Sequence, residues 1–585
     1  MGFVDKSQAR RPPAKARRNW ALVAWAMAVV VLLAVAGCAA IPTGGPVGKS
    51  DAVGPRDNSV NIGFEQFSPV DGASAESIVG GFVDSGTGIK DDFQVARQYL
   101  TQGLAQSWAP DQRTLVYKNT VTVSPGRAKN TFELTFDVVA TVDASGVLTP
   151  AKEGASEILS MKVVQVDGQW RISEAPDGVM LTEANFQNLY SAVSIYFYDP
   201  TYTYGVPDVR WLAGRSSRTT TAIVKAMLGG PAPYLKGAVV SAFPNGIALE
   251  RDSVPVNNNG LAKVGLTAQP LLETSVKQRQ QMHAQLLVTL QKSLNTVTGV
   301  QFLADDREVD MGGAADSVAP MIIDNAVPST QVALAKNELV TFDGTKISPV
   351  PKMASVAALI PSVPAMSYSG QNFAFRSGVG DQIYSVVPGA KPVLAISGVQ
   401  LTPPSFAPDG WLWSAAGDGS GMVVAINPND DGKLGDPVVL TVPWLVGQEV
   451  TTLRISRDGT RALVLSRANG TSRASLTGIF KTGEVPKGLT EPLSLTHTGA
   501  PTLGVWEGET GVAVMAPSGT EPVSIQLLDL MREPAFMDEL PSLQWLSAGS
   551  GSRNIKAQTK TELYSNVGNN WELVAKDLKQ ASFAG

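Results

Sequence analysis

The pattern of apolar and polar residues divides the chain into an export signal, a stalk and a folded body. Residues 1–37 combine six basic side chains with the first long apolar run, which ends in small residues as a signal peptide does. Residues 38–66 are rich in Gly, Pro, Ser and Asp without apolar periodicity, which predicts a flexible stalk. From residue 67 onward apolar residues recur at helical or alternating spacing. We therefore expect several folded domains beyond the stalk.

The first folded stretch, residues 67–190, changes from helical to alternating periodicity. Helix-spaced apolar residues predict two helices, and β-branched runs between turn residues predict four strands, so the stretch is expected to be an α+β domain. The predicted helices are residues 76–83 and 93–104, and the predicted strands are residues 114–123, 131–142, 158–166 and 169–172. The last two strands resemble the closing hairpin of nuclear-transport-factor-like cone folds.

The second stretch, residues 191–310, alternates strands and helices and predicts an α/β domain. A helix that Ser216 can cap is expected to stop at Gly229-Gly230-Pro231, and turn residues separate the later strands. The predicted strands are residues 193–198, 238–242, 247–256, 261–266 and 299–303, and the second helix is residues 273–294.

A linker, residues 311–325, leads into a strand-rich region, residues 326–585, in which a degenerate unit recurs. The turn glycines of three copies, Gly370, Gly410 and Gly459, stand 40 and 49 residues apart. That period is typical of one four-stranded propeller blade, and weaker copies near residues 511 and 545 predict five or six blades in all. A β-sandwich array is the alternative, but it does not explain the spacing.

Four short motifs of the second stretch carry a family resemblance. Their order and spacing resemble the GerMN domain of spore-germination and sporulation proteins, which is a small extracytoplasmic α/β module without an established catalytic site. The motifs are residues 228–231, 241–246, 260–264 and 285–290. The whole order of signal, α+β domain, GerMN-like domain and propeller resembles the actinobacterial LpqB lipoprotein family. This resemblance implies an association with the Mtr two-component system, whose sensor histidine kinase the protein would modulate through its extracytoplasmic domain.

The end of the apolar run resembles a bacterial lipobox, namely Val35, Ala36, Gly37 and Cys38. In a lipobox the chain is cleaved before the cysteine, which then carries an S-diacylglycerol and an N-acyl group. An uncleaved anchor is the alternative, because residues 20–41 make 22 residues and a spanning helix needs about 20. Both alternatives hold the protein at the cell membrane with its folded part on the extracytoplasmic face. Cys38 is the only cysteine, so the exported part has no disulfide.

Composition narrows the functional classes. The sequence has 47 basic and 52 acidic residues, of which six basic and one acidic lie in the signal. The rest of the chain therefore has a formal charge of −10, which argues against nucleic acid as a partner. The chain has two histidines, His283 beside an apolar helix face and His497 in a predicted loop between blades. No Gly-x-Ser-x-Gly motif and no zinc motif occurs in the sequence, so we expect neither catalysis nor a cofactor.

A weak calcium motif lies in the propeller region. Asn427, Asn429 and Asp431 stand at the first, third and fifth positions of an EF-hand-like loop, with Gly432 at the sixth. Position twelve is Val438 rather than glutamate, so a solvated hairpin tip is the favoured interpretation. Five tryptophans could stack on sugars but are expected to fill blade cores. They are Trp411, Trp413, Trp444, Trp506 and Trp545.

The sequence thus favours a non-enzymatic interaction protein of the cell envelope, whose domains bind the external part of another membrane protein. The alternative is a cell-wall glycan-binding or glycan-processing protein that uses the centre of the propeller. Glycan hydrolysis would require two carboxylates about 5–10 Å apart in an open cleft.

Overall fold

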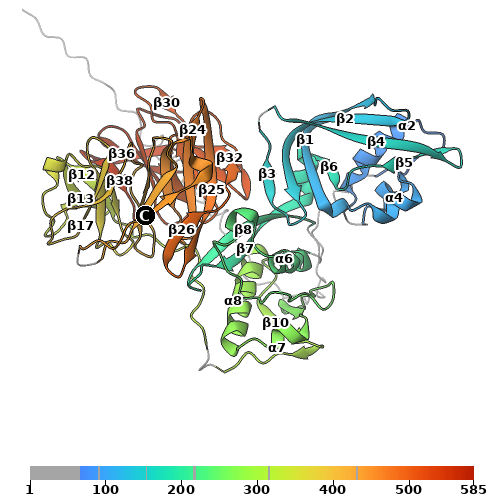
Figure 1. The fold of residues 1–585 in the computed structure, drawn as a ribbon, viewed down its shortest axis with the longest axis horizontal. Coiled ribbons are helices and arrows are strands. Elements are labelled where there is room, and N and C mark those ends of the chain that lie inside the picture. Colours follow the sequence, from blue (N-terminus) through green and yellow to red (C-terminus); the bar gives the residue numbers. More distant parts are fainter. Residues whose placement is uncertain are drawn as a thin grey trace, which may run out of the picture. The chain divides into compact units, whose positions relative to one another are not determined.

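The computed structural model describes residues 66–89, 92–152, 154–214, 219–313, 317–429, 432–551, 553–568 and 570–585. The signal, the lipobox residues Val35, Ala36, Gly37 and Cys38, and nearly all of the stalk lie outside these residues. Contacts within residues 63–585 join the described elements into one unit. Figure 1 colours this unit along the sequence from blue to red.

The N-terminal domain, from α2 to α5, begins with helices that cover a sheet. α2 (Ala75–Asp84) starts where the Ser74 side chain accepts a hydrogen bond from the Ser77 amide, which satisfies a free N–H of the first turn. The helix predicted over residues 93–104 is wrong as one element, because it is divided into α3 (Gln94–Gln98) and α4 (Gln102–Ser107). At the break the Thr101 amide donates to the Ile172 carbonyl, so the chain there joins the sheet.

The sheet of this domain has six strands in the described part, two more than predicted. Their order is β5-β4-β2-β1-β6, with β3 beside β2, and β6 runs parallel to β1. The missed strands, β3 and β6, are only three and four residues long, too short for a periodicity signal. The strands and last helix are β1 (Arg113–Pro125), β2 (Thr131–Asp143), β3 (Leu148–Pro150), β4 (Ser156–Val166), β5 (Gln169–Glu174), β6 (Val179–Thr182) and α5 (Glu183–Leu189).

The central domain, from β7 to β11, opens with a long antiparallel hairpin, which we call the connecting hairpin. It consists of β7 (Tyr190–Tyr198) and β8 (Gly205–Ala213). The remaining elements are α6 (Thr219–Leu228), β9 (Leu261–Gly265), α7 (Ala268–Leu272), α8 (Val276–Ser293), β10 (Gly299–Ala304) and β11 (Arg307–Glu308). α6 ends before Gly229 and Gly230 as predicted, and Gly230 has a left-handed φ of +90°.

The strands predicted over residues 238–242 and 247–256 are wrong. Val240, Leu249 and Val256 form only isolated bridges, to Tyr198, Leu266 and Ala262 respectively. Because each of these residues bridges to a different partner, they do not form a continuous hydrogen-bond ladder with one neighbouring strand. The alternating pattern indicates that these residues are buried, but it does not indicate which segment each of them pairs with.

The C-terminal region is a propeller of six blades in the described part, so the sandwich alternative is wrong. The innermost strands contact one another in a closed ring, in the order β38, β15, β19, β23, β28 and β34. Blade one is completed by both ends of the region, because β38 pairs with β12. Blades two, three and four follow the predicted unit, because Gly370, Gly410 and Gly459, with φ of +70°, +90° and +71°, make left-handed turns before buried strands.

The strands are listed from the innermost outward. Blade one is β38 (Lys579–Ser582), β12 (Gln331–Ala335), β13 (Glu338–Phe342) and β14 (Ile347–Pro349). Blade two is β15 (Ser362–Met366), β16 (Phe373–Arg376), β17 (Gln382–Val386) and β18 (Val393–Ser397). Blade three is β19 (Ser405–Phe406), β20 (Leu412–Ala415), β21 (Met422–Ile426) and β22 (Val438–Thr441).

Blade four is β23 (Glu449–Ile455), β24 (Arg461–Ala468), β25 (Thr471–Thr482) and β26 (Val485–Leu489), and β27 (Leu493–Leu495) also pairs with β25. Blade five is β28 (Leu503–Glu507), β29 (Gly511–Met515), β31 (Gln526–Asp529) and β32 (Arg532–Phe536). Blade six is β34 (Trp545–Ala548), β35 (Ile555–Gln558), β36 (Glu562–Val567) and β37 (Asn570–Lys576), and β30 (Pro522–Val523) pairs with β33 (Leu540–Pro541) outside the blades.

Four of the five tryptophans that were predicted to fill blade cores are buried core residues. Trp411, Trp413, Trp506 and Trp545 are buried, and Trp444 is half-buried. Side chains packed in this way between sheets present no ring face to a sugar in solution.

Candidate functional site

The connecting hairpin is the place where the three domains meet. The Trp211 amide donates to the Gly146 carbonyl of the N-terminal domain at 2.7 Å. The indole Nε1 of the same residue donates to the Leu530 carbonyl of blade five at 3.2 Å. One residue of the hairpin therefore bonds to both neighbouring domains.

A continuous apolar core joins the hairpin to the propeller. Val193 and Ile195 of β7 belong to the same buried cluster as Leu463 and Leu465 of β24 and Val514 of β29. Burial of this kind is worth about 25 cal/mol for each Å² of apolar surface removed from water. The central domain and blades four and five are thus packed as parts of one core.

Gly478 of β25 lets the two backbones approach. A Cβ atom at this position would lie 2.6 Å from the Cβ of Ala238 and 2.8 Å from the carbonyl oxygen of Tyr234, distances that real side chains do not reach. The hydroxyl of Thr490 also donates to that Tyr234 carbonyl. Glycine is therefore required here by the close contact, not by its φ angle.

A fully buried ion pair fixes the base of the hairpin. Arg210 donates through Nε to Asp208 Oδ1 at 2.8 Å and through Nη2 to Oδ2 at 2.7 Å. Its remaining donors reach the carbonyls of Ser145 and Gly230 at 2.7 and 2.9 Å. Burial acts to lower the pKa of Arg210, but the hydrogen bonds and charge of Asp208 outweigh it, so the pKa of Arg210 is raised and its guanidinium stays protonated.

A second buried pair lies at the turn between β23 and β24. Arg461 donates to Asp458 Oδ2 through Nη2 at 2.7 Å and through Nε at 3.1 Å, and also to the Glu509 carbonyl at 2.7 Å. Its guanidinium lies 4.9 Å from the ring centroid of Trp506. Burial again opposes the charge, and Asp458 again raises the pKa of the arginine above its usual value.

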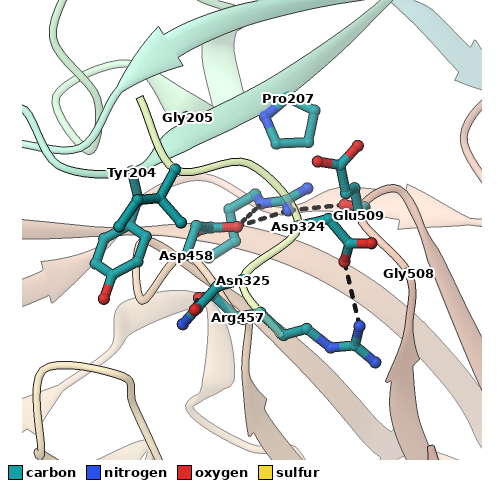
Figure 2. Close-up of a pocket in the computed structure, with 11 residues that line it drawn as sticks. Tyr204, Gly205, Pro207, Asp324, Asn325, Arg457, Asp458, Gly508 and Glu509 are labelled. Atoms are coloured by element: carbon teal, nitrogen blue, oxygen red, sulfur yellow. Dashed lines mark hydrogen bonds and ion pairs between the residues drawn. The ribbon is translucent and has the colours of Figure 1, made fainter. Parts of the chain in front are cut away.

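The segment between the central domain and the propeller is bonded to both. The Ile322 amide donates to Thr203 O at 3.0 Å, which places the segment beside the connecting hairpin. Asp324 then pairs with Arg457 Nη1 at 3.2 Å, as Figure 2 shows. Arg457 Nη2 in turn donates to the Gly549 carbonyl of blade six at 2.6 Å.

These contacts surround a hollow in which three carboxylates converge, those of Asp324, Asp458 and Glu509 (Figure 2). Asp324 and Asp458 are each held by an arginine, and Glu509 Oε2 accepts from the hydroxyl of Tyr196 at 2.8 Å. The hollow has a volume of about 10 Å³, which is room for a single water. A sugar ring cannot enter, so this junction does not have the glycosidase geometry.

The residues of the predicted calcium motif do not line this hollow. Asn427 and Asn429 lie between β21 and β22, where the Asn429 amide donates to the Lys433 carbonyl and the Asn429 carbonyl accepts from the Gly432 amide. Asp431 lies outside the described residues. Among the described residues, no group of three His, Cys, Asp or Glu side chains could hold a metal ion. The calcium motif stays an untested prediction.

Both histidines lie where the sequence predicted them. His283 Nε2 is 3.1 Å from the Val300 carbonyl oxygen, and its ring meets Phe302 edge-on at 6.2 Å between centroids. His497 lies in the loop that joins β27 of blade four to β28 of blade five. The sequence analysis did not identify the junction arginines, although Arg457 and Arg461 flank Gly459, which is a turn glycine of the repeat.

Comparison with known protein families agrees with this architecture. The model described as "Lipoprotein LpqB, N-terminal domain" matches residues 68–187, and "Sporulation and spore germination" matches residues 194–310. The model "Lipoprotein LpqB beta-propeller domain" matches residues 337–582. The fold and these matches define a multidomain lipoprotein with a C-terminal propeller.

The relatives extend over most of the chain. "Lipoprotein LpqB" of Rhodococcus opacus is 27% identical over 89% of this chain and 88% of its own length. The proteins of the same name from Streptomyces coelicolor and Cutibacterium acnes are each 28% identical, over 83% and 74% of this chain and 83% and 71% of their own lengths. The chain belongs to the LpqB lipoprotein family, and these relatives carry the name "Lipoprotein LpqB". None of the helices in the described residues is long and apolar enough to cross a membrane.

Proposed function

We propose that this protein is a non-enzymatic accessory protein that binds the extracytoplasmic domain of the Mtr sensor histidine kinase and modulates it. Through the kinase it would influence cell-wall homeostasis and cell division. Its membership of the LpqB lipoprotein family supports the accessory role. The identity of the kinase rests on the family resemblance alone.

The domain junction is the observation that carries the proposal. Arg210 donates to the Ser145 carbonyl of the N-terminal domain, and Trp211 donates to the Leu530 carbonyl of blade five. The hollow between the domains has a volume of about 10 Å³. Such a junction holds domains in a fixed arrangement and leaves no room for a substrate. A rigid multidomain body suits a protein that acts by presenting surfaces to a partner.

The lipid anchor is part of the same proposal. Cleavage after Gly37 would free Cys38 for diacylglycerol and N-acyl attachment, and two or more chains hold a protein firmly where one does not. Anchoring on the extracytoplasmic face confines the search for a membrane partner to two dimensions, which raises its effective concentration. A modest intrinsic affinity would then be enough for binding.

Crosslinking in intact cells tests the proposal. Cells express either the wild-type chain or Cys38→Ala, and the captured membrane proteins are identified by mass spectrometry. We expect the wild-type chain to capture the Mtr kinase, and Cys38→Ala to remain as an unprocessed precursor that is still held at the membrane. Failure to capture the kinase with either chain would contradict the proposed partner, and release of Cys38→Ala into the medium would contradict the proposed anchor.

A further inference from the structure

One buried arginine reaches the centre of the propeller. Arg454 belongs to β23, the inner strand of blade four. Its Nη1 donates to the Pro404 carbonyl, just before the inner strand of blade three, at 2.8 Å. Its Cζ atom lies 5.6 Å from the ring centroid of Trp545 in blade six. Blades three and six face each other across a six-bladed ring, so a guanidinium that contacts both lies near its middle.

This arginine has no acidic partner within the described residues. Its exposed fraction is 8%, and no carboxylate of the described chain lies within ion-pair distance. Burial lowers the pKa of Arg454 to about 10, with no acidic neighbour to oppose it. A buried cation without a counter-charge is costly, because the interior solvates charge poorly.

Three ion-paired arginines of this chain show how one edge of a guanidinium can hold a carboxylate. Arg210, Arg461 and Arg467 all bind a carboxylate through Nε and Nη2 together. In Arg454 the hydrogen bond to Pro404 uses Nη1, the atom outside that edge. Nε and Nη2 have no hydrogen bond to the described residues, and neither is among the fully buried atoms that lack a partner. Each of these two nitrogens therefore keeps at least a small accessible surface.

We propose that Arg454 is the centre of an anion-binding site in the middle of the propeller, which takes one oxyanion group, a phosphate or a carboxylate. Two oxygens of such a group match Nε and Nη2, as the carboxylate of Asp208 matches those of Arg210. The bound group also supplies the missing negative charge. The face of Trp545 flanks the guanidinium on another side and orients it. The site is additional to the kinase interaction and does not depend on it.

The test uses the full chain in detergent micelles with inorganic phosphate and acetate as probes. Phosphate binding is read from broadening of the phosphorus NMR signal, and both anions are compared by the rise in Tm over chloride at equal ionic strength. Arg454→Met removes the donors and keeps a similar apolar stem. Arg467→Met is the matched control, because it removes one positive charge from an exposed pair of the same blade.

We expect wild type and Arg467→Met to broaden the phosphate signal and gain several degrees in Tm at saturating anion. Arg454→Met should lose the broadening and keep only the general salting-out rise that phosphate gives any protein. A larger Tm rise with acetate than with phosphate would identify a carboxylate ligand. The proposal would be overturned if Arg454→Met broadened the phosphate signal as much as wild type does. It would also be overturned if wild type showed no broadening and neither anion raised its Tm.

Arg454→Lys covers the case in which the methionine variant does not fold. Lysine keeps the charge but cannot form the two-pronged contact, so phosphate should bind more weakly than to wild type. Undiminished binding to the folded lysine variant would show that the guanidinium edge is not the binding element, and the proposal would fail.

Discussion

Replacing Gly478 by alanine tests the packing between the central domain and blade four. The new Cβ would lie 2.6 Å from the Cβ of Ala238 and 2.8 Å from the Tyr234 carbonyl oxygen, so the backbones must separate by about 1 Å to restore ordinary contact. Overpacking of this kind costs about 1–3 kcal/mol. Alanine also restricts the unfolded chain, which returns about 0.4–1 kcal/mol. We expect a net loss of about 1–2 kcal/mol in the free energy of unfolding.

Calorimetry of Gly478→Ala measures this loss as a lower Tm, and hydrogen exchange locates it at the amides beside Tyr234 and Ala238. Gly519→Ala is the matched control, because that glycine has no positive φ and a Cβ there meets nothing within 4 Å. The control should change stability by less than about 0.5 kcal/mol. If both variants melt alike and exchange at Ala238 is unchanged, the two domains do not share the tight contact described above.

Three further changes have expected outcomes. Asp208→Ala leaves Arg210 buried without its counter-charge and should lower the free energy of urea unfolding by about 3–5 kcal/mol. The double variant Asp208→Leu, Arg210→Met removes both charges and should regain most of this loss. Equal losses in the two variants would show that the unpaired charge is not the cause. Deletion of residues 579–585 removes the inner strand of blade one and should abolish the near-ultraviolet circular dichroism of the propeller; a retained signal would contradict ring closure. Arg113 lowers the pKa of Glu157 below 4.5, so its stabilisation is complete above that pH and is lost as the pH falls through the folded pKa. The Tm advantage of wild type over Glu157→Gln should therefore shrink as the pH falls below the ordinary pKa range of a glutamate, and a constant difference would exclude this linkage.

Repeating local signals were sufficient to predict the propeller from sequence. Gly410 and Gly459 each end a tight turn before a buried strand. The spacing between such turns can be read directly along the sequence, because each blade is formed mainly by one continuous segment of chain. Connections inside the blades are short, so a turn residue and the buried strand after it recur together at a spacing of about one blade. The six-bladed closure through β38 was left open as five or six, because it depends on the two ends of the region meeting.

The junction was not predictable, because its partners are distant in sequence. Asp324 and Arg457 are 133 residues apart, and Tyr196 and Glu509 are 313 apart. No periodicity links such pairs, and a charged residue in a turn is usually solvated. The strand pattern over residues 247–256 misled for a related reason, since an alternating sequence records burial and not the partner of each residue.

The break between α3 and α4 has a similar origin, because the Thr101 amide there donates to the carbonyl of Ile172, a residue of β5 that is distant in sequence. The start of α3 is also set by tertiary packing. Phe93 precedes α3 in a left-handed conformation with φ of 57°, which its side chain does not favour. Burial of that side chain beside Trp108, with ring centroids 5.9 Å apart, holds the backbone in place. Tertiary packing therefore overrides the helical spacing that the sequence shows over residues 93–104.

The rate of kinase autophosphorylation tests the proposed function most directly. The full-length Mtr kinase is reconstituted in liposomes with the acylated protein, and a kinase lacking its extracytoplasmic domain serves as the control. We expect the protein to change the rate for the complete kinase and to leave the truncated kinase unaffected. An unchanged rate for the complete kinase at saturating lipoprotein, or an equal change for both kinases, would contradict modulation through the extracytoplasmic domain.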